Sequence, residues 1–178
     1  MHIDDGTGQG YKAKVTSDNR LRTHSVLESE VAYESEGNGN AYIWTASKDI
    51  DTTDNIIWLR NDSVTLNLHI QCITVSSDAS GSWFIYCPTG TTADGDTITG
   101  VNLLRSSSNV AEATCRSDAT GATPANYIYY GHGVADTDVP VDFHGALILG
   151  YLDEVAVDIT DEPGLAQATV CGFFREAS

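Results

Sequence analysis

The clearest hydrophobic pattern in the chain lies within Val64–Ser76, where apolar and polar residues alternate strictly from Val64 to Cys72. The apolar residues on every second position are Val64, Leu66, Leu68, Ile70 and Cys72. Alternation with period two places one set against a core and the other toward water, so we predict a half-buried strand. His69 belongs to the polar set, and its imidazole is therefore expected to face solvent.

A second apolar run, Asn55–Arg60, comes directly before this strand. The two runs are separated by the turn-forming residues Asn61, Asp62 and Ser63. Two strand patterns joined by a short polar turn are typical of a β-hairpin, and we predict one here.

Further strand patterns follow at regular spacing, separated by Gly, Asp and Asn turns. There is no alternation of strands with helices, which favours an all-β fold, a β-sandwich of jelly-roll type. We assign residues 37–178 to this sandwich, and we expect the Ala111–Arg116 strand at a sheet edge. The remaining expected strands are Ala41–Ala46, Ser82–Cys87, Thr97–Arg105, Ala111–Arg116, Tyr127–Val134, Val139–Gly145, Ala146–Leu152, Glu154–Ile159 and Ala166–Phe174.

The segment 1–36 has a different character and is predicted to be an N-terminal arm. Two short runs, Tyr11–Val15 and Arg20–Val26, flank a turn and can form a hairpin. The only helical pattern in the chain, Leu27–Ser35, follows them, and it is too short to be stable alone. The sequence Gly37–Asn40 then breaks the chain before the sandwich.

The charge balance excludes one class of partner. The chain has 25 Asp and Glu against 9 Lys and Arg, which gives a net charge of −16. Such a surface repels phosphate backbones, so we expect no nucleic-acid partner. Its acidity fits either a soluble, self-repelling protein or a halophilic one, because salt screens repulsion and shortens the Debye length to about 3 Å at 1 M. The scarcity of Lys favours the halophilic interpretation.

Against this acidic background the arm is basic. Four of the 9 basic residues, Lys12, Lys14, Arg20 and Arg22, lie within its first 22 positions, next to Tyr11. The arm is therefore a candidate anchor for an acidic partner, with an ordinary N-terminal hairpin as the alternative.

The chain has no apolar run long enough to span a membrane, and its start lacks the pattern of a secretory signal. We therefore expect synthesis in a cytoplasm and no membrane partner. The 4 cysteines form no CxxC pair, so zinc spacing is absent. Cys72 and Cys87 lie in phase with apolar strand positions, which favours buried free thiols, although a disulfide also fits the sequence.

Ligands for a metal ion are scattered through the loops. Asp94 and Asp96 lie in one loop, and Asp136 and Asp138 in another between two histidines. Carboxylates suit a structural Ca²⁺ or another cation. However, neither the loop with Asp94 and Asp96 nor a further acidic loop with Asp49, Asp51 and Asp54 has EF-hand spacing. We assign no metal or cofactor, and Asp94, Asp96, Asp136 and Asp138 are weak candidates for a cation site. The common nucleophile and nucleotide-binding motifs are absent, so no catalytic residue is assigned.

A better indication of recognition is the aromatic cluster Tyr127, Tyr129 and Tyr130, followed by His132. Strand alternation places Tyr127 and Tyr129 on one face and Tyr130 on the other. Tyrosine is common at interfaces because one end is apolar and the other can stay hydrated. The cluster is a candidate interface or ligand site, and packing across a sheet edge is the alternative.

Three segments resemble small virion proteins of tailed viruses. They are GTGQGYKAKVTSDNRLRTHSV (Gly6–Val26), IIWLRNDSVTLNLHIQCITVSSDASGSWFIY (Ile56–Tyr86) and GDTITGVNLLRSSSNVAEATC (Gly95–Cys115). The resemblance implies a short arm followed by a capsid-decorating β-sandwich, and it brings no catalytic residue. The acidic surface would suit a haloarchaeal virus.

On this basis we expect a non-enzymatic virion structural protein, a decoration or cementing subunit on the capsid surface. Its partners would be the major capsid protein, bound through the arm, and further copies of itself around a three-fold or five-fold axis. The alternatives are a turret or fibre subunit that binds a glycan or receptor and, in third place, a hydrolase.

Overall fold

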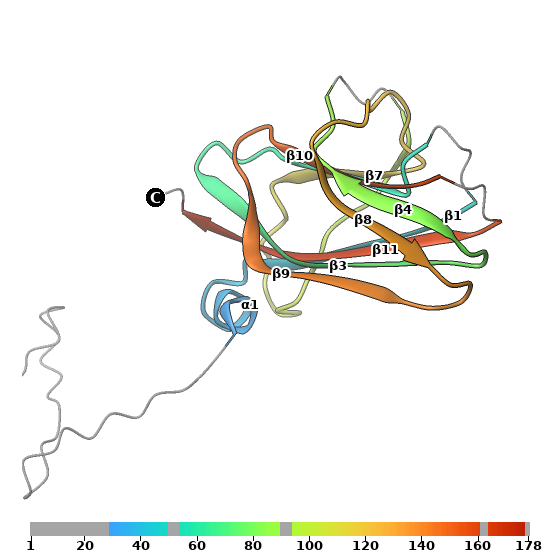
Figure 1. Cartoon of the computed structure of the whole chain (residues 1–178). Helices are drawn as coiled ribbons and strands as arrows, with labels where there is room; N and C mark the ends of the chain where they lie inside the picture. Colours follow the sequence, from blue (N-terminus) through green and yellow to red (C-terminus); the bar gives the residue numbers. More distant parts are fainter. Residues whose placement is uncertain (1–28, 50–53, 90–93, 161–163, 177–178) are drawn as a thin grey trace, which may run out of the picture.

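The computed structural model describes residues 29–49, 54–89, 94–160 and 164–176. Two antiparallel sheets pack face to face around a shared hydrophobic core, which confirms the predicted all-β sandwich (Figure 1). The elements are α1 (Glu30–Tyr33), η1 (Glu34–Asn38), β1 (Ala41–Lys48), β2 (Ile57–Asn61), β3 (Leu66–Ser77), β4 (Gly81–Tyr86), β5 (Asp96–Thr97), β6 (Val101–Asn102), β7 (Ala113–Ser117), β8 (Tyr127–Gly133), β9 (Val139–Leu149), β10 (Glu154–Ile159) and β11 (Ala166–Glu176).

The strand order is that of a jelly roll. One sheet has the order β6-β1-β11-β3-β9, and the other has the order β5-β7-β2-β10-β4-β8. The antiparallel pairs β1–β11, β2–β10, β3–β9 and β4–β8 form one long ribbon whose halves run in opposite directions. Successive pairs of this ribbon alternate between the two sheets, which is how a jelly roll buries one face of each sheet.

This winding contradicts the predicted hairpin of Asn55–Arg60 with Val64–Ser76. β2 and β3 lie in different sheets, so the turn between them crosses the sandwich. The amide of Asn61 holds this corner, because its Nδ2 donates to the carbonyl oxygens of Leu66 (2.8 Å) and Leu149 (2.9 Å). A turn motif alone does not distinguish a hairpin from a corner between sheets.

The strict alternation predicted along β3 is also interrupted. In the strand register, Gln71 is not paired with a residue of β9 or β11, so it forms a β-bulge. The bulge reverses which side chains face the core in the rest of β3. Ile73 therefore faces the core, whereas Cys72 is half-buried on the outer surface, opposite Cys171 on β11. Val64, expected in the apolar set, lies before the strand and is exposed.

His69 is half-buried instead of facing solvent, as had been expected. It stacks on Phe173 with ring centroids 5.1 Å apart, and its Nδ1 lies 3.1 Å from the carbonyl oxygen of Gly145. The approach is made by a kink in β9, where His144 and Gly145 have positive φ angles. The two strands predicted for Val139–Leu152 are thus one kinked strand that ends at Leu149.

The connection between β4 and β8 adds three strands to one flank of the roll. β7 pairs with β2 and β5 pairs with β7, while β6 pairs with β1 in the other sheet. The strand expected over Thr97–Arg105 is therefore split into the two-residue strands β5 and β6. The edge position expected for Ala111–Arg116 is wrong, because β7 lies between β5 and β2. We call this side, formed by β5, β6 and β7, the closed flank.

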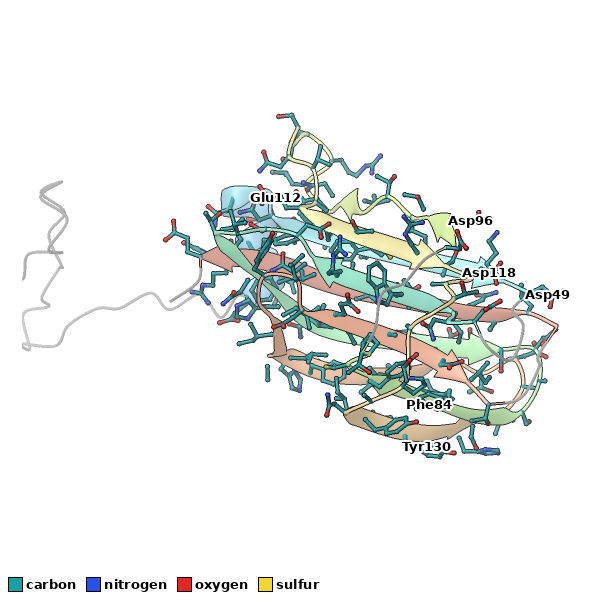
Figure 2. The ribbon with its side chains drawn as sticks, turned by 90° about the horizontal axis from the view of Figure 1, so that it is seen from above. Asp49, Phe84, Asp96, Glu112, Asp118 and Tyr130 are labelled. Carbon is teal, nitrogen blue, oxygen red and sulfur yellow. The ribbon has the colours of Figure 1, made fainter. Side chains whose placement is uncertain are left out.

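The opposite side, where β8 and β9 end the two sheets, we call the open flank. Figure 2 shows Phe84 and Tyr130 on the opposite side of the molecule from Glu112, Asp96 and Asp118. The two flanks therefore differ in chemistry as well as in strand content.

The helical pattern predicted over Leu27–Ser35 is confirmed where it is described. Ser29 caps α1 through its Oγ, which accepts from the N–H of Ala32, and η1 ends at Gly39 in the left-handed conformation. The helical segment thus extends to Asn38, beyond its predicted end.

Candidate interaction surface

The tyrosine cluster lies on β8, the last strand of its sheet. Tyr127, Tyr129 and Tyr130 are 59%, 41% and 65% exposed, and Ile128 between them is 36% exposed. Contiguous exposed aromatic side chains are unusual on a soluble protein and mark contact surfaces. We call β8 with these side chains the tyrosine edge. The predicted cluster is thus exposed on a sheet edge, and its role as an interface or ligand site stays a prediction.

The faces of the tyrosines differ from those predicted. Ile128 is a bulge without a partner on β4, because Tyr129 pairs with Ile85 and Tyr127 pairs with Tyr86. The extra residue brings Tyr127 and Tyr130 onto the same side, where both rings contact Phe84, at 5.2 Å and 6.1 Å between centroids. Tyr129 instead stacks on the core residue Trp83 at 5.3 Å.

His132 lies at the far end of the tyrosine edge and is exposed. Its Nδ1 is 3.4 Å from Oγ of Ser82 on β4. A base that activates a serine nucleophile lies about 2.6–3.2 Å from it, so this contact is looser than catalysis prefers. The pair therefore gives no support to a hydrolase.

Beneath the exposed tyrosines the outer face of the six-stranded sheet carries a second apolar cluster. It consists of the buried residues Trp58, Phe84, Tyr86, Ala119 and Ala156. Ala156 is small enough for Tyr86 to lie across it, and Asn55 Nδ2 donates to the Tyr86 hydroxyl at 2.7 Å. This cluster supports the tyrosine edge from below.

A buried carboxyl group adjoins that cluster and was not singled out by the sequence. Asp158 pairs with Phe84 across β10 and β4, and burial raises the pKa of its carboxyl group to about 6. The N–H of Ile159 donates to Asp158 Oδ1 at 2.7 Å, which favours the charged form but does not outweigh burial. The polar position of Asp158 in the pattern EVAVDI could have indicated an outward-facing side chain, but not that this side chain is buried.

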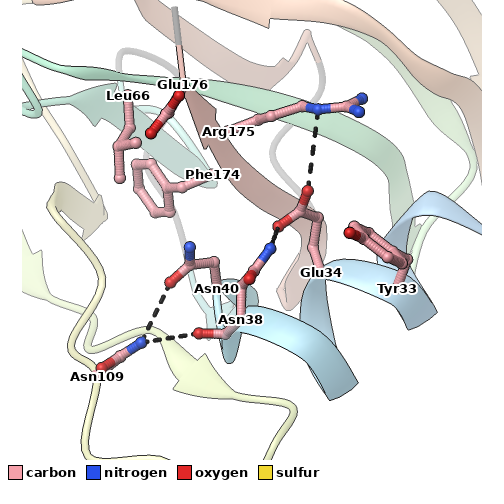
Figure 3. A pocket seen from close by; sticks show the side chains of 9 residues that line it. All are labelled: Tyr33, Glu34, Asn38, Asn40, Leu66, Asn109, Phe174, Arg175 and Glu176. Carbon is pink, nitrogen blue, oxygen red and sulfur yellow. Dashed lines mark hydrogen bonds and ion pairs between the residues drawn. The ribbon is translucent and has the colours of Figure 1, made fainter. Parts of the chain in front are cut away.

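A hollow lies where the helical segment joins the sandwich (Figure 3). It has a volume of about 490 Å³, and its polar lining is already engaged in internal contacts. Glu34 accepts from Asn38 Nδ2 at 2.6 Å and lies 3.9 Å from Nε of Arg175. Asn109 Nδ2 donates to the carbonyl oxygen of Asn38 at 3.0 Å and to Oδ1 of Asn40 at 3.2 Å. These contacts of Glu34 and Asn109 hold α1 and η1 on the sandwich, and we call them the clamp.

The proposed contact residues of the arm lie outside the described residues: Tyr11 and the basic residues Lys12, Lys14, Arg20 and Arg22. The described chain begins at Ser29, immediately before the clamped helical segment. The point at which the arm joins the sandwich is therefore fixed, at the end of the molecule where β11 finishes (Figure 1).

The weak cation candidates are not brought into one site. The carboxylate of Asp96 forms an ion pair with Lys48, which lowers the pKa of Asp96, and Asp94 is exposed in the same loop. Asp136 and Asp138 line a small hollow together with Asp78. Among the described residues, no group of three or more His, Cys, Asp or Glu is arranged to hold a metal ion.

The cysteines are free thiols in the described structure. Cys72 and Cys171 lie directly opposite each other, and burial raises the pKa of the Cys171 thiol to about 11. Cys72 and Cys87 are half-buried, so full burial, expected from their phase, is not observed.

No helix within the described ranges has the length and apolar character that crossing a membrane requires. Comparison of the chain with protein-family models, with curated protein sequences and with solved structures finds no match in any of the three.

Proposed function

We propose that this protein is a virion structural protein, a decoration or cementing subunit that carries out no reaction. In this proposal the basic arm attaches the subunit to the major capsid protein, and the jelly roll stands on the shell and contacts neighbouring subunits. The single observation that carries the proposal is the tyrosine edge, an exposed aromatic strand that lacks charge in an otherwise acidic molecule. Such a surface is suited to contacts with protein.

Two further features support it. The jelly roll is an architecture that viral capsid domains use, although lectin domains use it as well, so the fold alone does not decide. The clamp around Glu34 and Asn109 gives the arm a fixed starting point on the sandwich. A rigid exit point limits the positions that the arm reaches and so favours attachment at a defined distance from the body.

The experiment is removal of residues 1–26, which leaves Ser29 and the capped helical segment in place. We expect the shortened subunit to keep its far-UV circular dichroism and thermal unfolding but to lose co-sedimentation with capsid shells stripped of this subunit. Replacement of Lys12, Lys14, Arg20 and Arg22 with Gln should reproduce the loss at full length, because the contact is electrostatic.

Arg105→Gln is the control, because Arg105 is an exposed basic residue of the sandwich and not of the arm. It should co-sediment like the unchanged protein. Normal binding of the shortened subunit to the shells would contradict the proposal.

One observation favours a second candidate, a turret or fibre subunit that binds a glycan. The exposed residues Tyr127 and Tyr130 both contact Phe84 and offer an aromatic surface of the kind on which an apolar sugar face can stack. Binding of the purified protein to a glycan array, lost in Tyr127→Ala, would favour this function over decoration of the shell.

A further inference from the structure

We propose that a second copy of this chain pairs with the tyrosine edge, β8 against β8, in antiparallel orientation around a two-fold axis. This deepens the proposed function and rests on it for the biological setting, since it names the self-contact of the decoration subunit. The pairing would join two six-stranded sheets into one continuous sheet across the dimer.

The argument begins with the edges of the two sheets, because an unprotected edge strand readily pairs with another strand. The described structure has four edges: β5 and β8 in one sheet, β6 and β9 in the other. β5 and β6 have only two residues each. Strands this short offer too few backbone groups to support pairing, so the closed flank is protected by length.

The edge at β9 is protected by its sequence. Pro140 lacks a backbone N–H, Asp142 places an exposed charge on the strand, and the kink at His144 and Gly145 interrupts its course. Proline, charge and distortion are three of the devices by which native proteins keep edge strands from associating.

The edge at β8 has none of these over most of its length. From Ala119 to Ala135 the chain contains no Asp, Glu, Lys or Arg, and β8 contains no proline. The bulge at Ile128 lies near the start of the strand, and Tyr129–Gly133 pairs regularly with β4. The regular part of β8 therefore leaves a straight, uncharged edge facing away from the sheet.

The distribution of charge favours β8 as the place where a second copy of this chain can approach. A chain of net charge −16 repels its own copies, so self-contact requires a surface from which charge is absent. The closed flank displays Glu112, Asp96 and Asp118, whereas Figure 2 shows Tyr130 on the opposite side. Two copies that meet at β8 bring tyrosines together and keep these carboxylates far apart.

The geometry of the edge suits a two-fold axis through Gly131, the middle residue of the regular segment. Antiparallel pairing around this axis places Tyr130 of one copy opposite His132 of the other, and the reverse. Cross-strand pairs of this kind stabilise antiparallel sheets, and tyrosine tolerates the partly hydrated rim of an interface. The two-fold order differs from the three-fold or five-fold order expected from the sequence.

The test is the mass of the purified full-length chain in solution, by sedimentation equilibrium. At about 100 µM protein in about 1 M salt, where the Debye length is about 3 Å, we expect a species of twice the 19.1 kDa chain mass. Lower salt should weaken the dimer because the two acidic bodies then repel each other. A monomer under all these conditions overturns the proposal. It does so even if β8 then proves to bind a strand from another protein.

Tyr130→Lys should weaken dimerisation at least about tenfold, because it places lysines at the paired edges. The substitution makes each chain less negative, so a change in overall charge would act in the opposite direction. Tyr151→Lys is the matched control, since Tyr151 is 56% exposed but lies in the turn after β9. Equal weakening by both substitutions overturns the proposal.

Tyr130 contacts Phe84, and its replacement can disturb the fold, so His132→Lys provides a second variant at an exposed edge position. It should weaken dimerisation in the same direction. Hydrogen exchange should in addition show that amides of Tyr129–Gly133 become protected as protein concentration rises. Dimerisation without this protection would place the contact elsewhere and overturn the proposal.

These measurements use no capsid shell. A chain that dimerises through β8 but does not bind shells would contradict the proposed decoration function and leave the self-contact standing. A chain that binds shells and stays monomeric would do the reverse.

Discussion

The two flanks of the jelly roll show contrasting solutions to the same problem. On the closed flank, β6 pairs with β1 and β7 pairs with β2, so the insertion between β4 and β8 covers the edges of both sheets. On the open flank, β8 and β9 end their sheets without a further strand. Strand edges are a liability that a monomer must protect. On the open flank the sequence of β9 protects one edge, and β8 is left unprotected.

The same local contact appears on both flanks. Trp44 lies under Gly100 on the closed flank, and Trp83 lies under Gly131 on the open flank. Both tryptophans are buried, and among the described residues neither indole N–H has a hydrogen-bond partner. The difference is in what lies outside: further chain on the closed flank, and exposed tyrosine on the open flank. The core of the open flank is therefore as well buried as that of the closed flank, but its outer strand β8 is not covered by further chain.

The largest expected effect concerns Trp44 on the closed flank. Trp44→Ala should lower the free energy of unfolding by about 3–5 kcal/mol, because it opens a large cavity in the core. Tyr129→Ala on the open flank should lower it by only about 1 kcal/mol, since that ring is 41% exposed and contributes mainly its stacking on Trp83. Urea unfolding of both variants measures the difference, and equal losses would mean that the flanks are equally packed.

A smaller effect is expected from the cover over Trp44. A Cβ added at Gly100 would lie 2.7 Å from Trp44 Nε1, and the buried ring has little room to move. Gly100→Ala should therefore lower the free energy of unfolding by about 1–3 kcal/mol.

Gly37→Ala is the control for that substitution, because a Cβ there meets nothing within 4 Å. It should leave the free energy of unfolding unchanged or raise it slightly, since alanine loses less backbone entropy on folding. Unfolding midpoints in urea measure both variants. If Gly100→Ala leaves the free energy of unfolding unchanged, the residues around Trp44 can shift at little cost, and the prediction is wrong.

The smallest expected effect concerns Asp158, two strands inward from the tyrosine edge. Its folded pKa, about 6, is raised above the ordinary value of 3.8 because burial disfavours the charge. Its stabilising contribution is therefore fully present below about pH 4 and is lost as pH rises through 6. Asp158→Asn, which resembles the protonated acid, should raise the free energy of unfolding by about 1–2 kcal/mol at pH 8.

At pH 4 the same variant should match the unchanged protein, because the wild-type carboxyl group is then protonated. The measurement is the difference in unfolding free energy between variant and wild type across pH 4–8, which cancels the titration of the other acids. A constant difference over this range would mean that the Asp158 carboxyl group is well solvated, which would contradict its burial.

The chain sequence was sufficient for features that depend on neighbouring residues. Alternation of apolar and polar positions identified most strands, and the local pattern identified the helical segment, although that segment extends to Asn38. The sequence singled out Tyr127, Tyr129 and Tyr130 and left two interpretations open, an interface or ligand site and packing across a sheet edge. Local pattern alone did not choose between them.

The errors arose where one extra residue changes the phase or where strands choose partners. The bulges at Gln71 and Ile128 reverse the faces of Cys72 and Tyr127, since a shift of one residue turns every later side chain to the other side. The corner at Asn61 was taken for a hairpin because turn chemistry is the same in both.

By itself, then, the sequence determined that this is an acidic all-β sandwich with a basic N-terminal segment, since composition and period-two patterning follow from single residues and their neighbours. Only the tertiary structure decided which strands pair, which flank is closed and that the tyrosines lie on an uncovered edge. Strand pairing joins residues far apart in the chain, such as Tyr86 with Tyr127 and Ala41 with Phe173, and depends on the winding of the whole ribbon. Exposure of an edge is a property of the complete sheet, so no local pattern contains it.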